Sequence, residues 1–543
     1  MTAPETVDVL VVGAGFAGMR ALHALRGQGM SVVVLEAGDD VGGVWYWNRY
    51  PGARCDVESY DYSYSFSEEL EQEWRWNERF AAQPEILRYA QHVADHFGLR
   101  RDIVFGQQMT SATYDEQAAR WTVTTHTGRV WDAQFLVMAV GNLSATKAPD
   151  IAGLDIFAGR VFHTARWPHE PVDLTGLRVG VIGTGSSGAQ LIPIVAQQTA
   201  HLTVFQRSAN FSIPACNGPV SDERDAEVKA AYAERRAIAQ NSPSGLGFMP
   251  DRASAAAADP EERRARFEQA WAGAGFGFLF TYHDLLLDEA SNATAAEFCR
   301  EKIAAIVKDP RTRELLTPHG FPFGGKRPSV DSGYFETFNR DNVMLVDLRA
   351  TPIRDVTPTS LRTTDAEYPL DVLILATGFD AFTGALLRPD ITGRGGHSLR
   401  EAWSTGPRTY LGLGVAGFPN LFVIAGPGSP SLLSNVLLSI EHHVDWLAVL
   451  LRTAVADGIV EIEATEEAQD RWVEHVNRRA QETLYPRAPS YYMGDDLPGK
   501  PRVFMPYSGG VRDYRRILEQ VERDGYEGFA LRRSLLGETV PVR

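Results

Sequence analysis

Two glycine-rich segments of this 543-residue chain have the spacing of loops that bind the pyrophosphate of a dinucleotide. Gly13, Gly15 and Gly18 follow the apolar run VDVLVV, and Gly183, Gly185 and Gly188 follow RVGVIG. This spacing allows a tight turn, close approach of the backbone to a phosphate, and a helix whose first amides donate to that phosphate. The alternative is that the glycines serve plain turns. The repeat predicts two dinucleotide sites and therefore an oxidoreductase.

The residue at the end of the strand after each loop distinguishes the two cofactors. Glu36 ends the run SVVVLE, where its carboxylate can accept both hydroxyls of an unphosphorylated adenosine ribose, as in FAD. Gln206 stands at the equivalent place in the second unit, next to Arg207. An arginine at this corner suits a ribose 2′-phosphate, so we expect NADPH there. The alternative for Arg207 is a solvated charge at a strand end.

Three further segments contain residues that can line a reactive centre. In GGVWYWNRYPGARCDVESYDYSYSF, the flat surfaces of Trp45 and Tyr46 and the carboxylate of Asp56 can border a flavin. The linker FAGRVFHTARWP contains His163, which we expect to be a hydrogen-bonded structural residue rather than a base or a metal ligand. Neither His163 with His169 nor the adjacent His442 and His443 has the spacing of a metal site, so we expect no metal there. FGGKRP ends with the adjacent cations of Lys326 and Arg327, which without other support would be an exposed charged turn.

These segments resemble the type I Baeyer-Villiger monooxygenases. The linker matches the family fingerprint FxGxxxHTxxWP through Phe157, Gly159, His163, Thr164, Trp167 and Pro168. A second fingerprint matches through Gly43, Trp45, Tyr50, Pro51, Gly52 and Asp56. Similarity continues through KRPSVDSGYFETFNRDNV, ATGFD, GPGSPSLLSN and PGKPRVFMPYSGG, and so covers nearly the whole chain. RCDVES and GPGSPSLLSN resemble the phenylacetone and steroid branch more than the cyclohexanone branch.

The resemblance implies an FAD-containing, NADPH-dependent enzyme that inserts one oxygen of dioxygen beside a ketone carbonyl through a flavin peroxide, giving an ester or lactone. It implies that Arg327 stabilises the anionic peroxide, because arginine stays protonated, and that Asp56 orients this arginine. Lys326 would contact the NADP 2′-phosphate with Arg207. The resemblance also implies that a residue of the C-terminal loop reaches toward the nicotinamide cofactor. This residue is Tyr491 here and commonly tryptophan in relatives, so its reach and stacking differ from theirs.

By the same resemblance we expect further contacts with the cofactors and a substrate-side wall. The wall comprises Ser431, Leu432 and Leu433, and the adjacent leucines suggest an apolar or bulky ketone. The expected cofactor contacts, beyond those given above, are Phe16, Ala17, Gly43, Val44, Arg54, Cys55, Tyr62, Met109, Thr184, Ser186, Ser187, Gln190 and Val436.

Two other classes of protein share parts of this pattern. A heteroatom-oxidising flavin monooxygenase has both glycine-rich units and a shorter linker fingerprint, but HTxxWP, Asp56 and Arg327 favour ketone oxidation. Sulfoxidation is compatible with either chemistry. An uncoupled NADPH oxidase or an electron-passing redox flavoprotein would keep most motifs, although the sequence has no dithiol pattern for the latter.

The elements that must position these residues follow an α/β pattern. Short β-branched runs such as VDVLVV, SVVVLEA, FLVMAVG, RVGVIG, HLTVFQR, DVLILATG and NLFVIAG predict parallel strands covered on both faces. We expect two Rossmann-like dinucleotide-binding domains with a helical insertion. Residues 1–145 and 386–543 form the FAD-binding domain, 146–216 and 333–385 the linker and NADP-binding domain, and 217–332 the insertion.

Composition restricts the setting in which the protein works. A formal net charge of -16 argues against nucleic acid or an anionic membrane as a partner. The three cysteines form neither a CxxC pair nor a zinc pattern, so we expect a reduced, cytoplasmic location. We find no signal sequence and no membrane span, and no obligatory protein partner is implied.

Overall fold

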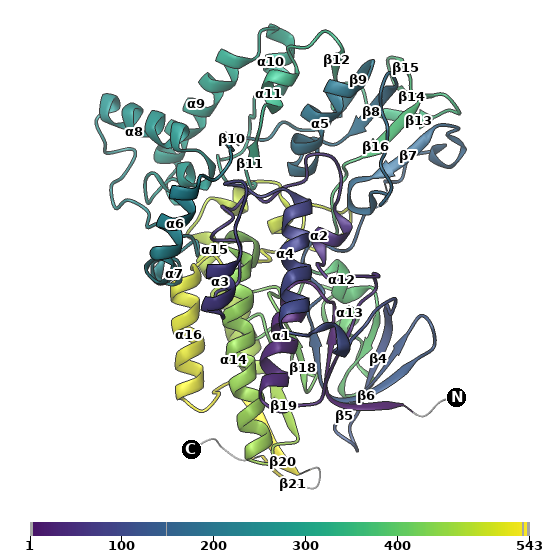
Figure 1. Ribbon diagram of the computed structural model, residues 1–543, viewed down its shortest axis with the longest axis vertical. Coiled ribbons are helices and arrows are strands. Elements are labelled where there is room, and N and C mark those ends of the chain that lie inside the picture. Colours follow the sequence, from purple (N-terminus) through teal and green to yellow (C-terminus); the bar gives the residue numbers. More distant parts are fainter. Residues whose placement is uncertain (1–3, 148, 535–536, 540–543) are drawn as a thin grey trace.

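A computed structural model describes residues 4–147, 149–534 and 537–539 of the chain. Figure 1 shows an elongated molecule with a first sheet and long helices at one end. A second, smaller sheet and a group of helices lie side by side at the other end. None of the described helices has the length and hydrophobicity needed to cross a bilayer.

The first sheet contains the N-terminal glycine-rich unit. In spatial order its strands are β17 (Asp390–Thr392), β4 (Met109–Asp115), β5 (Arg120–Thr125), β6 (Val130–Met138), β1 (Glu5–Val12), β2 (Val32–Leu35) and β3 (Ile103–Val104), with β18 (Leu421–Val423) also paired to β6. Val12 at the end of β1 pairs in parallel with Leu35 and Met138. Helices α1 (Phe16–Gly27) and α14 (Val436–Ala456) pack together beside this sheet. This cover on β1, β2 and β6 explains their continuous apolar runs.

The second sheet is parallel throughout and contains the second unit. Its order is β12 (Val343–Asp347), β9 (His201–Gln206), β8 (Arg178–Ile182), β16 (Val372–Leu375) and β7 (Arg160–His163). Helix α5 (Ser186–Gln198) follows β8. The predicted linker thus contributes a strand, β7, which the sequence did not indicate. Because β7 is a short edge strand with only intermediate or high exposure, it lacks the apolar pattern that marks the inner strands.

The helical insertion lies between β9 and β12 in the sequence. Its helices are α6 (Asp222–Ala230), α7 (Tyr232–Asn241), α8 (Pro260–Gly273), α9 (Glu289–Ile306) and α10 (Pro310–Leu316), and the short strands β10 (Ser212–Pro214) and β11 (Ser329–Asp331) pair at its base. Four of these helices begin after Ser or Asp residues whose side chains accept a backbone amide, namely Ser221, Asp259, Asp288 and Asp309. Such N-caps end the preceding loop and satisfy the free amides of each first turn.

The remaining elements complete the two sheet regions and the C-terminal part. The helices are α2 (Val44–Trp47), α3 (Glu68–Glu73), α4 (Gln83–His96), α11 (Tyr334–Thr337), α12 (Gly384–Leu387), α13 (Leu399–Ala402), α15 (Glu466–Gln481) and α16 (Val511–Arg523). The short 3-10 helices are η1 (Arg100–Asp102), η2 (Leu154–Ile156), η3 (Thr164–Arg166), η4 (Gly275–Phe280), η5 (Arg394–Gly396), η6 (Ser431–Leu433), η7 (Tyr485–Arg487) and η8 (Tyr491–Met493). Two antiparallel sheets comprise β13 (Ile353–Val356), β14 (Ser360–Thr363) and β15 (Glu367–Pro369), and β19 (Glu461–Ala464), β20 (Phe529–Ser534) and β21 (Gly537–Thr539).

Candidate functional site

The first glycine-rich loop turns directly from β1 into α1. Gly13 has φ +103°, and a Cβ on it would lie 2.7 Å from the carbonyl oxygen of Ala139. A Cβ on Gly18 would lie 1.8 Å from the carbonyl oxygen of Gly13, so helix and turn pack too closely for a side chain. Since α1 begins at Phe16, the free amides of its first turn follow directly after this loop. The loop has the form needed to hold a pyrophosphate.

Glu36 lies at the end of β2, beside the same loop. Its carboxylate oxygens accept the amides of Ala14 and Gly38, each at 2.7 Å. Burial raises the pKa of Glu36 despite these hydrogen bonds. Among the described residues no cation pairs with it, so its remaining acceptor capacity suits neutral hydroxyl donors. These contacts fit the adenosine ribose of FAD.

Residues 42–66, here called the aromatic loop, follow β2 and pack against the first glycine-rich turn. A Cβ on Gly43 would lie only 2.8 Å from the Cα of Gly15. The indole Nε1 of Trp45 donates to the hydroxyl of Tyr62 at 3.0 Å, which fixes the indole plane. Val44 is 39% exposed although its neighbours Trp45 and Tyr46 are buried. An apolar side chain left open beside the phosphate loop is what a flavin ring would cover.

The segment with the second fingerprint joins the two nucleotide units. The Tyr50 hydroxyl donates to Gln190 Oε1 at 2.8 Å, and Gln190 Nε2 donates to the carbonyl of Arg54 at 3.1 Å. Gly52 has φ +85°, and a Cβ there would lie 2.3 Å from the carbonyl oxygen of Gln190. Tyr50 and Gly52 therefore let the aromatic loop pack directly on α5 of the second unit.

The second glycine-rich loop repeats the first. Gly183 has φ +109°, and a Cβ on it would lie 2.4 Å from the carbonyl oxygen of Ala376. A Cβ on Gly188 would lie 2.3 Å from the carbonyl oxygen of Gly183. Helix α5 begins at Ser186, which places Ser186 and Ser187 in its first turn. The loop has the same form as the first, that of a cradle for a phosphate, and is here called the second cradle.

Three cations gather beside the second cradle. Lys326 is half-buried, and this burial together with Arg207 and Arg349 lowers the pKa of Lys326 to about 8. Within the described part of the chain, none of these three side chains forms an ion pair with a carboxylate. Cations that repel one another need an anion, and a 2′-phosphate fits them. The sequence interpretation missed Arg349, which follows β12; because β12 pairs in parallel with β9, Arg349 meets Arg207 at one edge.

One predicted contact of this corner needs correction. Gln206 is 4% exposed, and its side-chain amide donates to the carbonyl of Leu315 at the end of α10, at 2.7 Å. Its side chain is therefore turned into the interior rather than toward a ribose. At position 206 itself, what favours a phosphorylated cofactor is the absence of an acidic group, and not a contact of the glutamine.

The depressed pKa of Lys326 predicts a pH dependence of cofactor use. As the pH rises through about 8 in the free enzyme, Lys326 loses its proton and one attraction for the 2′-phosphate disappears. We expect kcat/KM for NADPH to fall by about tenfold between roughly pH 7.5 and 9.5, the effect of one charge-assisted hydrogen bond. Steady-state kinetics with NADH, which lacks the phosphate, and with Lys326→Arg, which stays charged, should show no such fall. The same fall in the arginine variant would contradict the assignment.

Arg327 and Asp56 form a bidentate ion pair between the two units. Arg327 Nε and Nη2 donate to the Asp56 carboxylate at 2.7 and 2.9 Å, and Nη1 donates to the carbonyl of Leu432 at 2.8 Å. The guanidinium also lies 4.5 Å from the ring centre of Phe276. Burial opposes the charge, but the Asp56 carboxylate raises the pKa of Arg327 well above its usual value. The arginine is thus a fixed cation that holds its protons.

The C-terminal segment covers this ion pair with two tyrosines. Tyr491 and Tyr492 have ring centres 4.5 Å apart, and Tyr491 also faces the ring of Phe382. Burial raises the pKa of Tyr492, against the opposing effect of the nearby Arg327. Both phenols therefore stay protonated at neutral pH. Tyr491 also lies in the neighbourhood of Arg327, and its contact with the nicotinamide cofactor stays a prediction.

Asp496 fastens the same segment to the rest of the protein. Its side chain is 4% exposed and accepts the amide of Ala381 at 3.0 Å. It also lies 3.7 Å from Lys147 Nζ and 3.2 Å from Lys500 Nζ. Lys500 in turn pairs with Asp380 of the ATGFD motif at 2.8 Å. This cluster, here called the latch, comprises Lys147, Asp380, Asp496 and Lys500.

Neutralising the latch is expected to loosen the cover over the site. Asp496→Asn keeps the size of the side chain but removes the negative charge that the two buried lysines share, which is costly inside a protein. We expect NADP to dissociate at least about tenfold faster and more hydrogen peroxide to form per NADPH. Stopped-flow cofactor displacement and peroxide assays measure both. Asp495→Asn, in the same segment but paired with Arg502 at 3.2 Å, is the matched control. An Asp496 variant indistinguishable from this control would contradict the latch.

The linker fingerprint holds the two units together rather than facing a reaction. His163 Nδ1 accepts the amide of Ala165 at 3.1 Å, so its proton is on Nε2, which donates to the carbonyl of Lys147 at 3.1 Å. Burial lowers the pKa of His163, which is therefore neutral at pH 7. Arg166 lies 4.4 Å from the ring centre of Trp47 in the aromatic loop. Through Arg166 and Trp47, the linker fingerprint thus connects β7 with the aromatic loop.

The other predicted site residues take two kinds of position. Thr164 and Trp167 are buried within the fingerprint, and a Cβ on Gly159 would meet the carbonyl oxygen of Asp371 at 2.4 Å. The remaining residues lie at the start of α1 (Ala17), in the second cradle (Thr184, Gly185), in the aromatic loop (Cys55), at the start of β4 (Met109), before β7 (Phe157), after η3 (Pro168) and at the start of α14 (Val436).

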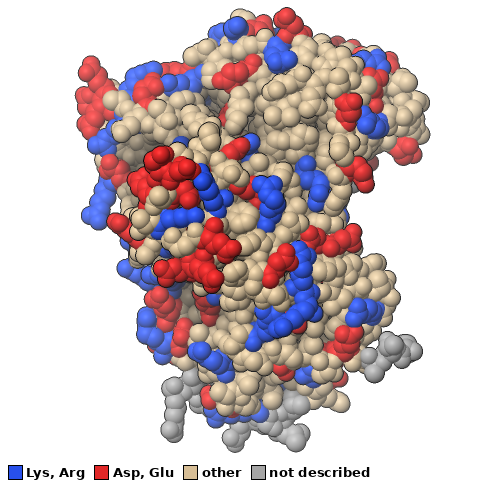
Figure 2. Space-filling model, viewed as in Figure 1, with Lys and Arg blue, Asp and Glu red and all other residues tan. Residues whose placement is uncertain are grey.

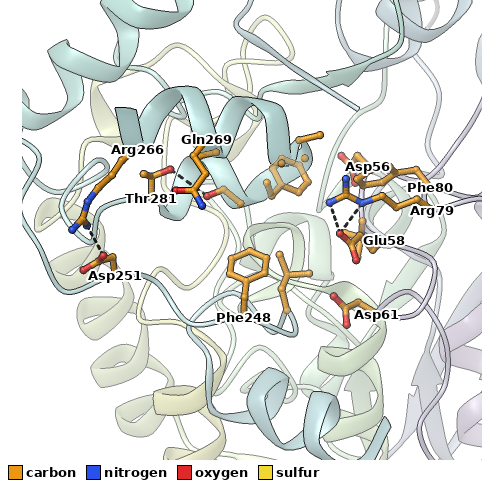
Figure 3. A pocket seen from close by; sticks show the side chains of 18 residues that line it. Asp56, Glu58, Asp61, Arg79, Phe80, Phe248, Asp251, Arg266, Gln269 and Thr281 are labelled. Carbon is orange, nitrogen blue, oxygen red and sulfur yellow. Dashed lines mark hydrogen bonds and ion pairs between the residues drawn. The ribbon is translucent and has the colours of Figure 1, made fainter. Parts of the chain in front are cut away.

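A cavity of about 440 Å³ opens next to Asp56, between the aromatic loop region and the helical insertion (Figure 3). Phe80, Leu246, Phe248 and Phe276 provide its apolar lining. The charged groups of the wall are neutralised by ion pairs: Glu58 with Arg79 and Arg235, Asp61 with Arg235, Asp251 with Arg266, and Asp56 with Arg327. The volume is that of a pocket for a small organic molecule.

The predicted substrate wall lies beside Arg327 but outside the lining of this cavity, so its role stays a prediction. Ser431, Leu432 and Leu433 do not line this cavity. Ser431 is completely buried, and its hydroxyl accepts a hydrogen bond from Asn142 Nδ2 at 2.7 Å. The segment contributes instead through the Leu432 carbonyl, which accepts from Arg327. The aromatic lining comes from distant parts of the chain, so sequence spacing offered no signal for it.

The fold and its two nucleotide sites define a flavoprotein that binds FAD and NADPH, and comparisons with known proteins define it further. A family model described as pyridine nucleotide-disulphide oxidoreductase matches residues 10–237. The chain is 44% identical over 529 residues to a Baeyer-Villiger monooxygenase of Pseudooceanicola batsensis, covering 97% of this chain and 96% of that protein. It is 42% identical over 528 residues to a phenazine N-monooxygenase of Lysobacter antibioticus, covering 96% and 97%.

The solved structure of an oxidised steroid monooxygenase bound to NADP superposes with a TM-score of 0.94 at 55% identity, covering 97% of this chain and all of that one. The chain belongs to the Baeyer-Villiger monooxygenase family. It is an FAD-containing, NADPH-dependent monooxygenase, as the sequence predicted. Its three cysteines are free and two are buried, so the described residues offer no counterpart to disulphide chemistry.

Proposed function

We propose that Arg327 and Asp56 are the catalytic pair and that the adjoining cavity receives a neutral, largely apolar ketone. Bound FAD, reduced by NADPH, supplies the activation of dioxygen. The observation that carries the proposal is the bidentate ion pair whose carboxylate, Asp56, lines an aromatic cavity.

Arg327 is suited to stabilise negative charge on oxygen beside the substrate carbonyl. Three of its five N–H donors bind Asp56 and the Leu432 carbonyl, which leaves two for an oxygen atom. Because its pKa is raised, it gives electrostatic stabilisation without releasing a proton to that oxygen. Asp56 fixes the guanidinium plane and balances its charge before the substrate arrives.

The charge balance of the cavity indicates the class of substrate. Its wall presents aromatic rings and paired charges, as described above, so a carboxylate or an ammonium group would enter without a counterion. A neutral ketone with a bulky apolar body matches both the lining and the volume.

The test is to supply the holoenzyme with NADPH, isotopically labelled dioxygen and matched pairs of neutral ketones and keto acids. We expect labelled esters or lactones and at least about tenfold higher kcat/KM for each neutral member, the cost of an unpaired charge. Hydrogen peroxide as the sole product would contradict the oxygenase assignment and indicate an uncoupled NADPH oxidase. Preference for the keto acids would contradict only the substrate class.

Heteroatom oxidation is a second candidate function, supported by the full-length likeness to a phenazine N-monooxygenase. Including thioethers and aromatic N-heterocycles in the same assay distinguishes it. Turnover of heterocycles without any ester formation would favour this alternative.

We also propose that the enzyme acts in the cytoplasm without an obligatory protein partner. Its free thiols, one of them the exposed Cys216, and its acidic balance support this setting. Fractionation of the source cells with size-exclusion chromatography of the active enzyme tests both statements.

A further inference from the structure

Two histidines and a glutamate converge where α3 ends beside α4. His92 and His96 are one helical turn apart, so they lie on the same side of α4. Glu73 is the last residue of α3, and its Oε2 lies 3.7 Å from His92 Nε2 and 3.6 Å from His96 Nδ1. The three ligand atoms lie within 4.8 Å of one another. They have no part in the nucleotide sites or the cavity.

These separations suit a shared ion better than direct contacts. They exceed the length of a hydrogen bond, so the groups are close without satisfying one another. A tetrahedral zinc ion about 2.0–2.1 Å from each ligand sets neighbouring ligand atoms about 3.4 Å apart, close to the 3.7 and 3.6 Å that separate Glu73 Oε2 from the two histidine nitrogens. His92 Nε2 is shielded from solvent and has no hydrogen-bond partner among the described residues. The Trp74 ring, 5.3 Å from that of His92, restricts its rotation.

The surroundings supply further negative charge. The other ring nitrogen of His96, Nε2, lies 4.0 Å from the Glu69 carboxylate, which adds a second negative charge near a bound cation. No Lys or Arg among the described residues pairs with Glu69 or Glu73. Acidic side chains gather on this face over the position of α3 (Figures 1 and 2). Glu73 at the C-terminus of a helix also gains from a nearby cation.

We propose that Glu73, His92 and His96 bind one divalent transition-metal ion of the zinc class, with water in the fourth position. The mixed nitrogen and oxygen ligand set favours zinc, nickel or copper over calcium or magnesium. The ion joins the end of α3 to α4. Helix α4 begins at Gln83, which donates to the carbonyl of Trp45 in the aromatic loop, so the ion stabilises an element that supports the flavin side.

The test is isothermal titration of ZnCl₂ into chelator-treated, FAD-loaded enzyme, with the thermal midpoint followed in parallel. We expect one equivalent bound with a micromolar dissociation constant and a higher midpoint at saturating zinc. His92→Ala and Glu73→Gln should each weaken binding by at least about tenfold and remove the midpoint shift. His319→Ala is the matched control, because His319 has one glutamate neighbour, Glu314 at 3.4 Å, but no second histidine in the site.

Each outcome decides the proposal. Stoichiometric binding that both site variants lose and the control retains supports it. Absence of saturable binding of zinc, nickel and copper, or equal binding by the wild type and the site variants, overturns it. Should His92→Ala fold poorly without metal, Glu73→Gln, altered at a half-exposed residue, provides the same comparison.

Discussion

Replacing Arg327 by alanine is expected to abolish ester formation while NADPH still reduces the bound FAD. The variant loses the only cation that faces Asp56 in the described structure and leaves that carboxylate without its bidentate partner. Loss of a preorganised charge at a developing oxyanion lowers turnover by about 10²–10³-fold or more. Anaerobic stopped-flow absorbance measures flavin reduction, and chromatography of the products measures ester formation.

The control for this prediction is an arginine that lines the cavity adjoining the ion pair. Arg266→Ala removes a cation that lines the cavity but pairs with Asp251, at the end away from Asp56 (Figure 3). We expect it to retain most of the ester formation. If Arg327→Ala kept ester formation within about tenfold of the wild type, another group would have to stabilise the oxygen charge.

Replacing Arg207 by alanine is expected to remove most of the preference for NADPH over NADH. Arg207 is exposed at the end of β9, in the cluster with Lys326 and Arg349, and its charge has no carboxylate partner among the described residues. A charge-assisted contact with the 2′-phosphate is worth about 1.5–3 kcal/mol, so KM for NADPH should rise by about 10–100-fold. KM for NADH should change by less than about twofold.

Initial-rate kinetics with both nucleotides test this expectation. Arg354→Ala is a suitable control, since Arg354 is an exposed cation of the same region that pairs with Asp355 at 3.4 Å. Its effect on both nucleotides should be small. Equal increases in KM for NADPH and NADH in Arg207→Ala would mean that the residue does not contact the phosphate.

Local features of the chain were sufficient to predict both cradles. The turns at Gly13 and Gly183 need positive φ and close backbone contacts within one strand-turn-helix unit, so glycine spacing and a preceding apolar run reveal them. The strands covered on both faces were predicted for the same reason, and the α/β class with two nucleotide sites is confirmed by the relatives. The roles of Arg327 and Asp56 were implied by family resemblance, and their direct contact is consistent with it.

Other features depend on segments that meet only after folding. Arg349 joins Arg207 because β12 pairs with β9, although the helical insertion separates them in the sequence. The latch of Asp496 with Lys147, the aromatic cavity, and the position of Ser431 inside the wall likewise depend on packing between distant parts. The conformation of a turn and the apolar pattern of a strand depend on a few neighbouring residues, so they can be predicted from the sequence. Contacts between distant side chains depend on how whole elements pack, so only the tertiary structure decides them.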